Sequence, residues 1–255
     1  MDDLLELTGR AEATHFWFRG FRKFLAPVIA DLARGARLEP DGKGRRGLRL
    51  VDCGCGTGHN LQLLHPHGKA VGFDLGEVGP ARARATGFAV LRGDVTQIPL
   101  ASDSFDVATS FDVLQCVEAD LAAVREMARI VRPGGVVIVT LAALDALRGD
   151  HAEVWHEVRR YTPATARRLM NEAGLKPERV SYMFASLFPL MASVRFAQRV
   201  TRRFGRTVRP DTDITVPSGP INLLLTALVS AEAALVRHVP MPIGSSLLVV
   251  ARKES

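Results

Sequence analysis

Short apolar runs alternate with amphipathic segments between residues 48 and 141. The runs, rich in Val, Leu and Phe, are LRLVDC (48–53), AVGFDL (70–75), FAVLRG (88–93), FDVATSF (105–111) and VVIVTL (136–141). Runs of this kind are typical of strands buried on both faces of a parallel sheet. Because helical patterns lie between them, the sequence predicts an open, doubly wound α/β sheet.

Amphipathic patterns predict the helices. The segments whose apolar residues recur at helical spacing are 15–34, 58–64, 117–131 and 161–175. The third segment ends at RPGG, where Pro133 and the glycines after it stop a helix and turn the chain into the next strand. In the fourth, Thr162 is a predicted cap and Pro163 lies in the first turn.

The last third of the chain departs from this alternation. Two apolar helix candidates, 190–204 and 221–239, are separated by a polar, proline-containing loop at 206–220. Together they form an insertion at about 187–241 between two strand-like runs, 176–185 and 245–253. Connections of this length are usually functional.

Composition says little about the fold, but it indicates which classes of partner the protein could bind. The chain has 255 residues, 47% of them hydrophobic, enough for a sizeable core, and a formal net charge of +6. The basic balance suits an anionic substrate or an anionic membrane surface, although an arginine-rich genome would produce it equally well. No basic and apolar leader opens the sequence, and the apolar stretch 180–194 is too short to cross a bilayer. We therefore expect a cytoplasmic protein.

The segment LRLVDCGCGTGHN carries the strongest chemical signal. After a predicted strand it places Asp52, then Gly54, Gly56 and Gly58 at alternate positions. Glycines there let the backbone take positive φ and let a ligand lie directly on the peptide planes. Cys53 and Cys55 lie too close together for the usual metal-binding pair and no second pair exists, so we expect packing roles and no metal.

This motif differs from the dinucleotide fingerprint G-x-G-x-x-G and resembles the first motif of class I S-adenosylmethionine (SAM)-dependent methyltransferases. The resemblance continues through VGFDLG, LRGDVTQIPLASDSFD and the segment that ends in RPGGVVIVT, and so covers about 48–141. It implies a Rossmann-like, seven-stranded sheet with an antiparallel last strand. We expect a single methyltransferase domain over 1–255, with lid helices in 1–40, the SAM-binding core at 48–141 and a substrate-side half at 142–255.

The resemblance assigns the cofactor-binding residues. The loop from Asp52 to Gly58, Cys55 included, would wrap the amino-acid end and the ribose of SAM. Asp74 would accept hydrogen bonds from both ribose hydroxyls, with Leu75 beside it. Asp94 would take the adenine amino group, and the Val95 amide and Phe111 complete the predicted set. Gln115 and Cys116 stand where related chains often carry Glu and His, which puts the analogy of substrates in doubt.

The N-terminal segment HFWFRGFRKFL is similar to a feature of the bacterial small-molecule subgroup of this family. Trp17 and Phe18 would close over the cofactor, while Arg19 or Arg22 would neutralise its carboxylate. Alternatively, these aromatic residues simply pack on the sheet.

The acceptor side is predicted to follow the fifth strand, in LRGDHAEVWHEVRRYTP. Methyl transfer is an in-line displacement that needs alignment in a dry cavity, and it needs a general base only if the acceptor arrives protonated. His151, His156 and Tyr161 are the catalytic candidates, and Arg159 or Arg160 would hold an anionic group of the substrate. The alternative is a polar linker with solvated side chains.

The insertion would roof the acceptor pocket, lie on a membrane as a peripheral contact, or form a homodimer interface. We expect a bulky, apolar or amphipathic small-molecule acceptor and no nucleic acid, since arginines do not alternate with aromatic residues as stacking platforms would. Two other functions remain open: a non-catalytic SAM-binding subunit and a nicotinamide (NAD)-dependent oxidoreductase.

Overall fold

The computed structural model describes residues 8–38, 47–202, 204 and 215–254. Parts of two predicted segments therefore lie outside the described residues: the lid at 1–40 and the loop at 206–220.

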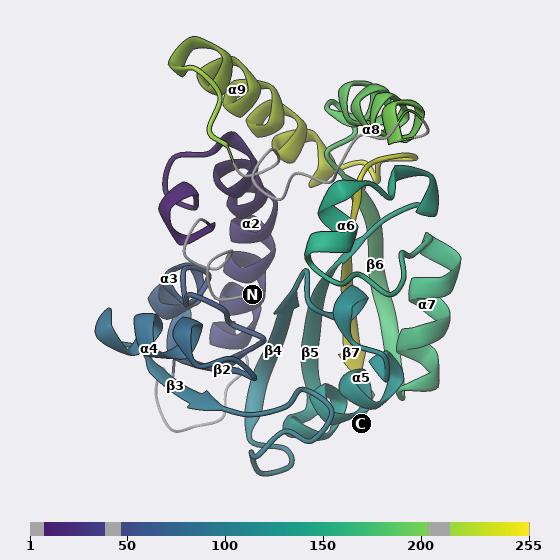
Figure 1. The fold of residues 1–255 in the computed structure, drawn as a ribbon. Helices are drawn as coiled ribbons and strands as arrows, with labels where there is room; N and C mark the ends of the chain where they lie inside the picture. Colours follow the sequence, from purple (N-terminus) through teal and green to yellow (C-terminus); the bar gives the residue numbers. More distant parts are fainter. Residues whose placement is uncertain (1–7, 39–46, 203, 205–214, 255) are drawn as a thin grey trace.

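A seven-stranded sheet forms the centre of the fold, in the order β3-β2-β1-β4-β5-β7-β6 (Figure 1). Its strands are β1 (Leu48–Cys53), β2 (Gly68–Asp74), β3 (Ala89–Arg92), β4 (Phe105–Phe111), β5 (Val131–Ala142), β6 (Leu175–Met183) and β7 (Ser246–Lys253). The first five are parallel, and β7 lies antiparallel between β5 and β6. The predicted Rossmann-like sheet with an antiparallel last strand is confirmed.

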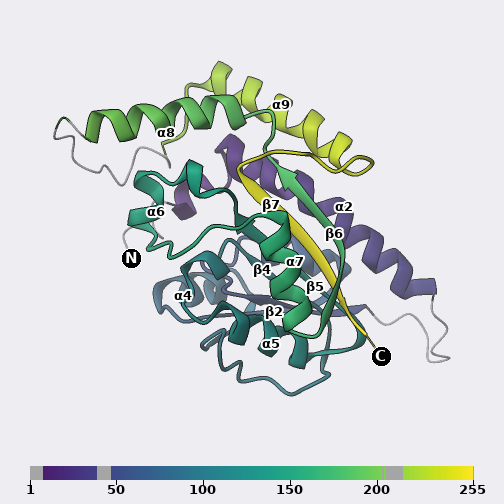
Figure 2. The same cartoon turned by 90° about the vertical axis from the view of Figure 1, so that its right-hand side faces the viewer.

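Helices cover both faces of the sheet (Figure 2). The helices are α2 (Phe16–Leu38), α3 (Leu61–Leu64), α4 (Val78–Ala85), α5 (Asp120–Ile130), α6 (Asp150–Val154), α7 (Pro163–Glu172), α8 (Phe188–Arg202) and α9 (Gly219–Val236). One buried cluster joins α5 and α7 to the sheet, and a second joins α2, α3 and α9 to its opposite face. Since successive strand residues point to opposite faces, both clusters draw on every central strand.

Several sequence predictions match in detail. β1 and β4 have the predicted bounds, and Thr162 caps α7 in a reciprocal capping box with Thr165. The RPGG segment turns as expected at Gly134 (φ 75°), although β5 already begins at Val131, before the turn. The sequence patterns did not predict α4 or α6. Both helices are short, and α4 is only weakly amphipathic.

The apolar stretch 180–194, predicted to be too short to cross a bilayer, is not the segment with the length of a membrane span. Within the described residues, α9 is the helix that is long and apolar enough, by length and composition, to cross a membrane. Segment 180–194 instead contains the end of β6 and the start of α8.

Candidate active site

The glycine loop begins at the carboxyl end of β1 and runs toward α3. Gly54, Gly56 and Gly58 have φ values of 82°, 49° and 80°, a region that residues with a Cβ rarely adopt. A Cβ on Gly54 would lie 2.5 Å from a Val113 methyl, and one on Gly58 would lie 2.4 Å from the Ala83 Cβ. The glycines therefore allow a sharp turn and the close approach of α4 and of the segment after β4.

Asp74 ends β2 beside this loop. Its Oδ2 accepts a hydrogen bond from the Gly56 amide at 2.9 Å, and its Oδ1 accepts one from the Gly76 amide at 2.9 Å. Both donors belong to the backbone, so the carboxylate is held in one orientation. It lies at the carboxyl edge of the parallel strands, where doubly wound sheets bind their ligands.

Asp52 lies inside the sheet beneath the loop. Only 1% of the residue is exposed, and its Oδ1 accepts a 2.7 Å hydrogen bond from the Thr109 hydroxyl on β4. Burial raises the pKa of Asp52 to about 7; the Thr109 hydrogen bond opposes the shift, and the charge of Asp74 adds to it. The geometry favours an electrostatic role for Asp52 over the direct cofactor contact predicted from the sequence.

The two cysteines of the motif point to opposite faces of the sheet. Cys53 belongs to the cluster under α5 and α7, and Cys55 to the cluster under α2. The Cys55 amide donates to the Phe73 carbonyl at 3.0 Å, while its carbonyl accepts from the Gly58 amide at 2.9 Å. Burial raises the pKa of both thiols, so both stay neutral. These contacts favour a packing role for Cys55 over a cofactor contact.

The turn before α2 contacts the glycine loop. The Thr57 hydroxyl donates to the Glu12 carboxylate at 2.6 Å, and the Arg22 guanidinium donates to the Glu12 carbonyl at 2.9 Å. Burial raises the pKa of Glu12, and the Thr57 hydrogen bond and the charge of Arg22 oppose that shift. Sequence reasoning missed Glu12, because its partner lies 45 residues away and no local pattern marks the pair.

Trp17 packs against Phe184, which follows β6. Its ring stacks on Phe184, with centroids 3.8 Å apart and planes 9° from parallel. This arrangement corresponds to the alternative in which the aromatic residues pack on the sheet. Of the residues predicted for the lid, Arg22 lies near the loop. Burial lowers the pKa of His59, which follows Gly58, and the positive charge of Arg22 lowers it further.

The residues predicted for the adenine end follow β2 and β3. The Gly93 amide donates to the Asp74 carbonyl at 3.0 Å, so these two strand ends are adjacent. Leu75 is 64% exposed and offers an apolar surface there. Asp94 is exposed, and its Oδ1 accepts hydrogen bonds from the amide and the hydroxyl of Thr96, both at 2.8 Å. Val95 is buried.

Phe111, at the end of β4, has its side chain in the core. It is buried and meets Phe21 edge to face, with ring centroids 5.7 Å apart. The ring of Phe111 therefore packs against α2, and the cofactor contact of this residue stays a prediction.

The next residue, Asp112, is a site candidate that sequence reasoning missed. It leaves β4 with a φ of 56°, a conformation that non-glycine residues adopt mainly under constraint, often at functional sites. The Thr140 hydroxyl donates to its Oδ1 at 3.0 Å. Burial raises the pKa of Asp112 to about 6; Glu157 adds to this shift, and Arg160 opposes it. The signal that the sequence offered was the position of Asp112, directly after a predicted parallel strand.

A buried ion pair lies beside Asp112. The guanidinium of Arg160 is 2.8 Å from the Glu157 carboxylate, and both side chains are less than a tenth exposed. His151 Nε2 lies 4.0 Å from the same carboxylate and is partly exposed. His156 is exposed and has a φ of 53°. The structure thus places His151 in this cluster and leaves His156 at its solvent side.

Tyr161 and Arg159 have structural contacts that disfavour the roles predicted for them. The Tyr161 hydroxyl is buried and donates toward the Leu114 carbonyl at 3.2 Å and the Asp120 carboxylate at 2.8 Å. Burial and Asp120 raise the pKa of Tyr161, so its hydroxyl stays protonated near neutral pH. Arg159 pairs with Asp120 at 3.1 Å and donates to the Val117 carbonyl at 2.5 Å, where it joins two loops.

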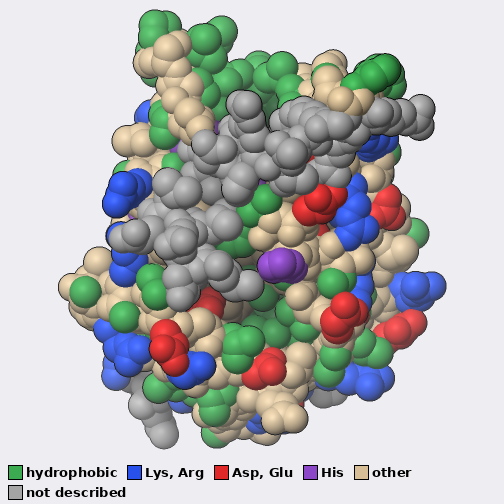
Figure 3. Space-filling view, viewed as in Figure 1, with side chains coloured by type: hydrophobic (Ala, Val, Ile, Leu, Met, Phe, Trp, Pro, Cys, Tyr) green, Lys and Arg blue, Asp and Glu red, His purple; other side chains and the backbone are tan. Residues whose placement is uncertain are grey.

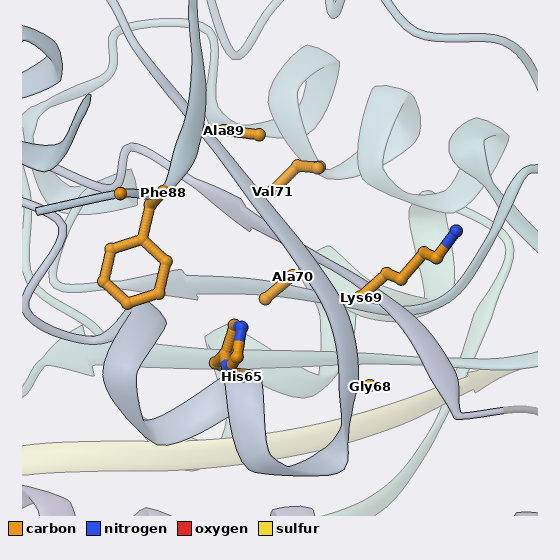
Figure 4. Close-up of a pocket in the computed structure, with 8 residues that line it drawn as sticks. His65, Gly68, Lys69, Ala70, Val71, Phe88 and Ala89 are labelled. Carbon is orange, nitrogen blue, oxygen red and sulfur yellow. The ribbon is translucent and has the colours of Figure 1, made fainter.

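A separate hollow lies between β2, β3 and the turn after α3 (Figure 4). It is lined by His65, Gly68, Lys69, Ala70, Val71, Gly87, Phe88 and Ala89. These residues include the start of β2, whereas Asp74 and the glycine loop lie at the opposite, carboxyl end of the strand. The hollow is therefore not part of the candidate active site.

The sheet order, the glycine loop and Asp74 together define a class I methyltransferase fold. Residues 51–139 match the family described as a methyltransferase domain. The chain is 35% identical over 127 residues to malonyl-[acyl-carrier protein] O-methyltransferase of Serratia marcescens, covering 49% of each chain. It is 34% identical over 154 residues to demethylmenaquinone methyltransferase of Roseiflexus sp. strain RS-1, covering 55% of this chain and 61% of that one.

The chain thus spans about half the length of the curated relatives it matches. Among solved structures, the methyltransferase of Haloferax volcanii in complex with the Trm112 activator has a TM-score of 0.60 at 19% identity, covering 100% of this chain and 99% of that one. The [4+2]-cyclase SpnF has a TM-score of 0.55 at 21% identity, covering 91% of this chain and 80% of that one. At these identities the structural likeness shows the fold alone.

Proposed function

We propose that this protein is a SAM-dependent methyltransferase that methylates a small-molecule acceptor by in-line displacement. The observation that carries the proposal is the contact between Asp74 and the Gly56 amide at the carboxyl edge of a methyltransferase domain. The relatives act, by their names, on malonyl-[acyl-carrier protein] and on demethylmenaquinone, and so support a small or carrier-bound acceptor.

The residues present fit the cofactor. Three glycines expose bare backbone, and a carboxylate is fixed beside them at the next strand end. The helix after the loop, α3, has only four residues, so it offers little of the helix dipole that a pyrophosphate would use. This favours a ligand without phosphate, and it disfavours the NAD-dependent alternative.

Each part of the cofactor has a candidate partner. Asp74 would accept hydrogen bonds from the ribose hydroxyls, and Leu75 with Asp94 would meet the adenine. Arg22 would face the cofactor's carboxylate, and the charge of Asp52 would favour its ammonium group. When bound, SAM supplies an electrophilic methyl group on a sulfonium.

Acceptor activation is assigned to the segment after β4. Asp112 would take a proton at its carboxylate from a hydroxyl or phenol acceptor, since its pKa of about 6 leaves it mostly ionised at neutral pH. Asp112 is held by the Thr140 hydroxyl, and the charges of Glu157 and Arg160 act on its pKa in opposite directions. His151, the base predicted from the sequence, is the second candidate because it lies next to Glu157.

The acceptor we favour is bulky and apolar or amphipathic. The apolar helices α8 and α9 lie above the carboxyl ends of the strands (Figure 1), and a Cβ on Gly149, just before α6, would lie 2.4 Å from the Arg195 side chain of α8. The insertion therefore borders the acceptor side of the site.

Calorimetry with S-adenosylhomocysteine and with NAD tests the cofactor assignment directly. We expect heat with the first ligand only; heat with NAD alone would replace the proposal by the oxidoreductase. Incubation with SAM and a panel of quinol, phenol and acyl-carrier acceptors should then yield S-adenosylhomocysteine. Binding without turnover by the isolated chain across the panel would support the non-catalytic SAM-binding subunit instead.

A further inference from the structure

The outward face of α9 has the polarity of an interior surface. Its exposed residues are all apolar, glycine or proline: Gly219, Pro220, Ile221, Leu223, Leu224, Ala227, Leu228, Ala231, Ala234 and Leu235. Leu224, for example, is 68% exposed. An ordinary surface helix turns its charged and polar residues outward. A continuous exposed apolar face of this kind marks a binding surface.

The polar residues of α9 point inward and are bonded there. The Asn222 side chain accepts from the Phe16 amide at 2.8 Å and donates to the Thr14 carbonyl at 2.9 Å. The Glu232 carboxylate accepts from the amides of Ala185 and Ser186 at 2.8 and 2.9 Å. These bonds fix the rotation of the helix and tie it to the protein, so α9 lies along the body and does not cross a bilayer.

Helix α8 repeats the arrangement. Its buried Arg195 donates to the buried Gln198 at 2.9 Å, while apolar side chains point outward. The exposed large apolar residues of α8 and the turn after it are Leu190, Val194, Phe196, Val200 and Phe204, and the polar Ser193, Arg199 and Thr201 are exposed on the same helix. Both helices lie at the same end of the molecule in two perpendicular views (Figures 1 and 2), and hydrophobic side chains gather at that end (Figure 3). We call the exposed apolar residues of α8 and α9 the α8–α9 face.

The exposed charged side chains described on α8 and at the end of α9 are arginines. Segment 187–241 contains seven arginines and three acidic residues. Arg199 on α8 and Arg237 at the end of α9 are exposed, whereas Glu232, the carboxylate among the described residues of these helices, is bonded inward. A symmetric pairing of two copies would bring arginine against arginine with no acidic partner from these helices. An anionic lipid surface provides the complementary charge.

We propose that the α8–α9 face docks on an anionic lipid bilayer, with its apolar side chains in the headgroup and acyl boundary and its arginines against lipid phosphates. Because the face lies above the carboxyl ends of the strands, the docked enzyme directs its acceptor side toward the bilayer. The docking itself does not depend on methyl transfer, and it is measured without cofactor, so its failure is distinct from failure of the proposed function.

Cosedimentation of the full chain with vesicles tests the docking. The wild-type protein should pellet with vesicles of phosphatidylcholine and phosphatidylglycerol, bind phosphatidylcholine alone much more weakly, and be released by salt. The double variant L224Q/L228Q should bind about tenfold more weakly or worse. The matched control is Leu91→Gln, an exposed leucine on the distant strand β3, which should bind like wild type. Circular dichroism and melting temperature show that each variant is folded.

The contribution of the arginines to vesicle binding is tested by the double variant that combines Arg199→Glu and Arg237→Glu. Its control is Arg168→Glu on the remote helix α7. The first pair should lose most binding to anionic vesicles, and the control should lose little. Equal binding by wild type and folded L224Q/L228Q would overturn the proposal. So would a wild-type protein that ignores vesicles but sediments as a dimer that the double variant abolishes, since that result assigns the face to a second copy.

Discussion

The Asp74 carboxylate accepts a hydrogen bond from the Gly56 amide at 2.9 Å, which joins the tip of β2 to the centre of the glycine loop. The same carboxylate accepts from the Gly76 amide, so one side chain orders the backbone on two sides. A ligand that lies across the loop therefore meets a carboxylate already oriented toward it, with less ordering entropy to lose on binding.

Asp74→Ala should weaken S-adenosylhomocysteine binding by about 1–3 kcal/mol, because a charged acceptor is lost from both the ribose and the loop. Isothermal calorimetry measures the change. Glu77→Ala, an exposed acid three residues along the chain, is the control and should bind as wild type does. Unchanged affinity in Asp74→Ala would count against the ribose assignment.

Gly58→Ala should destabilise the fold more than Gly87→Ala. Both glycines have positive φ, 80° and 90°, so both variants incur the conformational cost of about 1 kcal/mol. A Cβ on Gly87 meets nothing within 4 Å, whereas one on Gly58 lies 2.4 Å from the Ala83 Cβ. The additional clash should cost about 1–3 kcal/mol in urea unfolding. Equal costs would show that α4 moves away freely.

Without cofactor, stability should fall as pH rises from about 4 to 7, through the titration of Asp52. Its pKa is about 7 in the folded protein, against an ordinary value of 3.8 for an aspartic acid side chain in water, so the folded state binds the proton more tightly in that window. Above pH 7 the buried carboxylate costs on the order of a few kcal/mol. Asp52→Asn should flatten this part of the pH dependence of the free energy of unfolding. A wild-type profile in the variant would remove Asp52 as the cause.

Asp112→Asn should lower kcat about 100-fold or more on an acceptor that must lose a proton. In the wild type, kcat should fall as pH drops below about 6, because the base becomes protonated. That acidic limb should vanish in Asp112→Asn and persist in His151→Gln. If instead His151→Gln removes the limb and Asp112→Asn keeps it, His151 is the base.

Local patterns were sufficient for most of the fold, for the glycine loop and for the acid beside it. Strands buried on both faces need continuous apolar runs, and a tight turn at a strand end needs glycine, so β1, β4 and the loop at Gly54–Gly58 were visible in the chain. Asp74 was visible for the same reason, since it directly follows such a run. The short helices α4 and α6 were not, because too few turns leave no clear period.

Local sequence is enough to predict the parallel strands, the glycine loop and the acid that ends β2, because each shows a pattern within a few residues, whereas the pairing of the strands joins segments far apart in the chain. Long-range contacts were needed to show that Glu12 holds Thr57, that Asp112 meets Thr140 beside Glu157 and Arg160, and that Tyr161 and Phe111 serve packing. They also set which side of α9 faces outward, since Asn222 and Glu232 find their partners on distant segments. Burial and pairing across the fold determine these charges and orientations, and no local pattern encodes them.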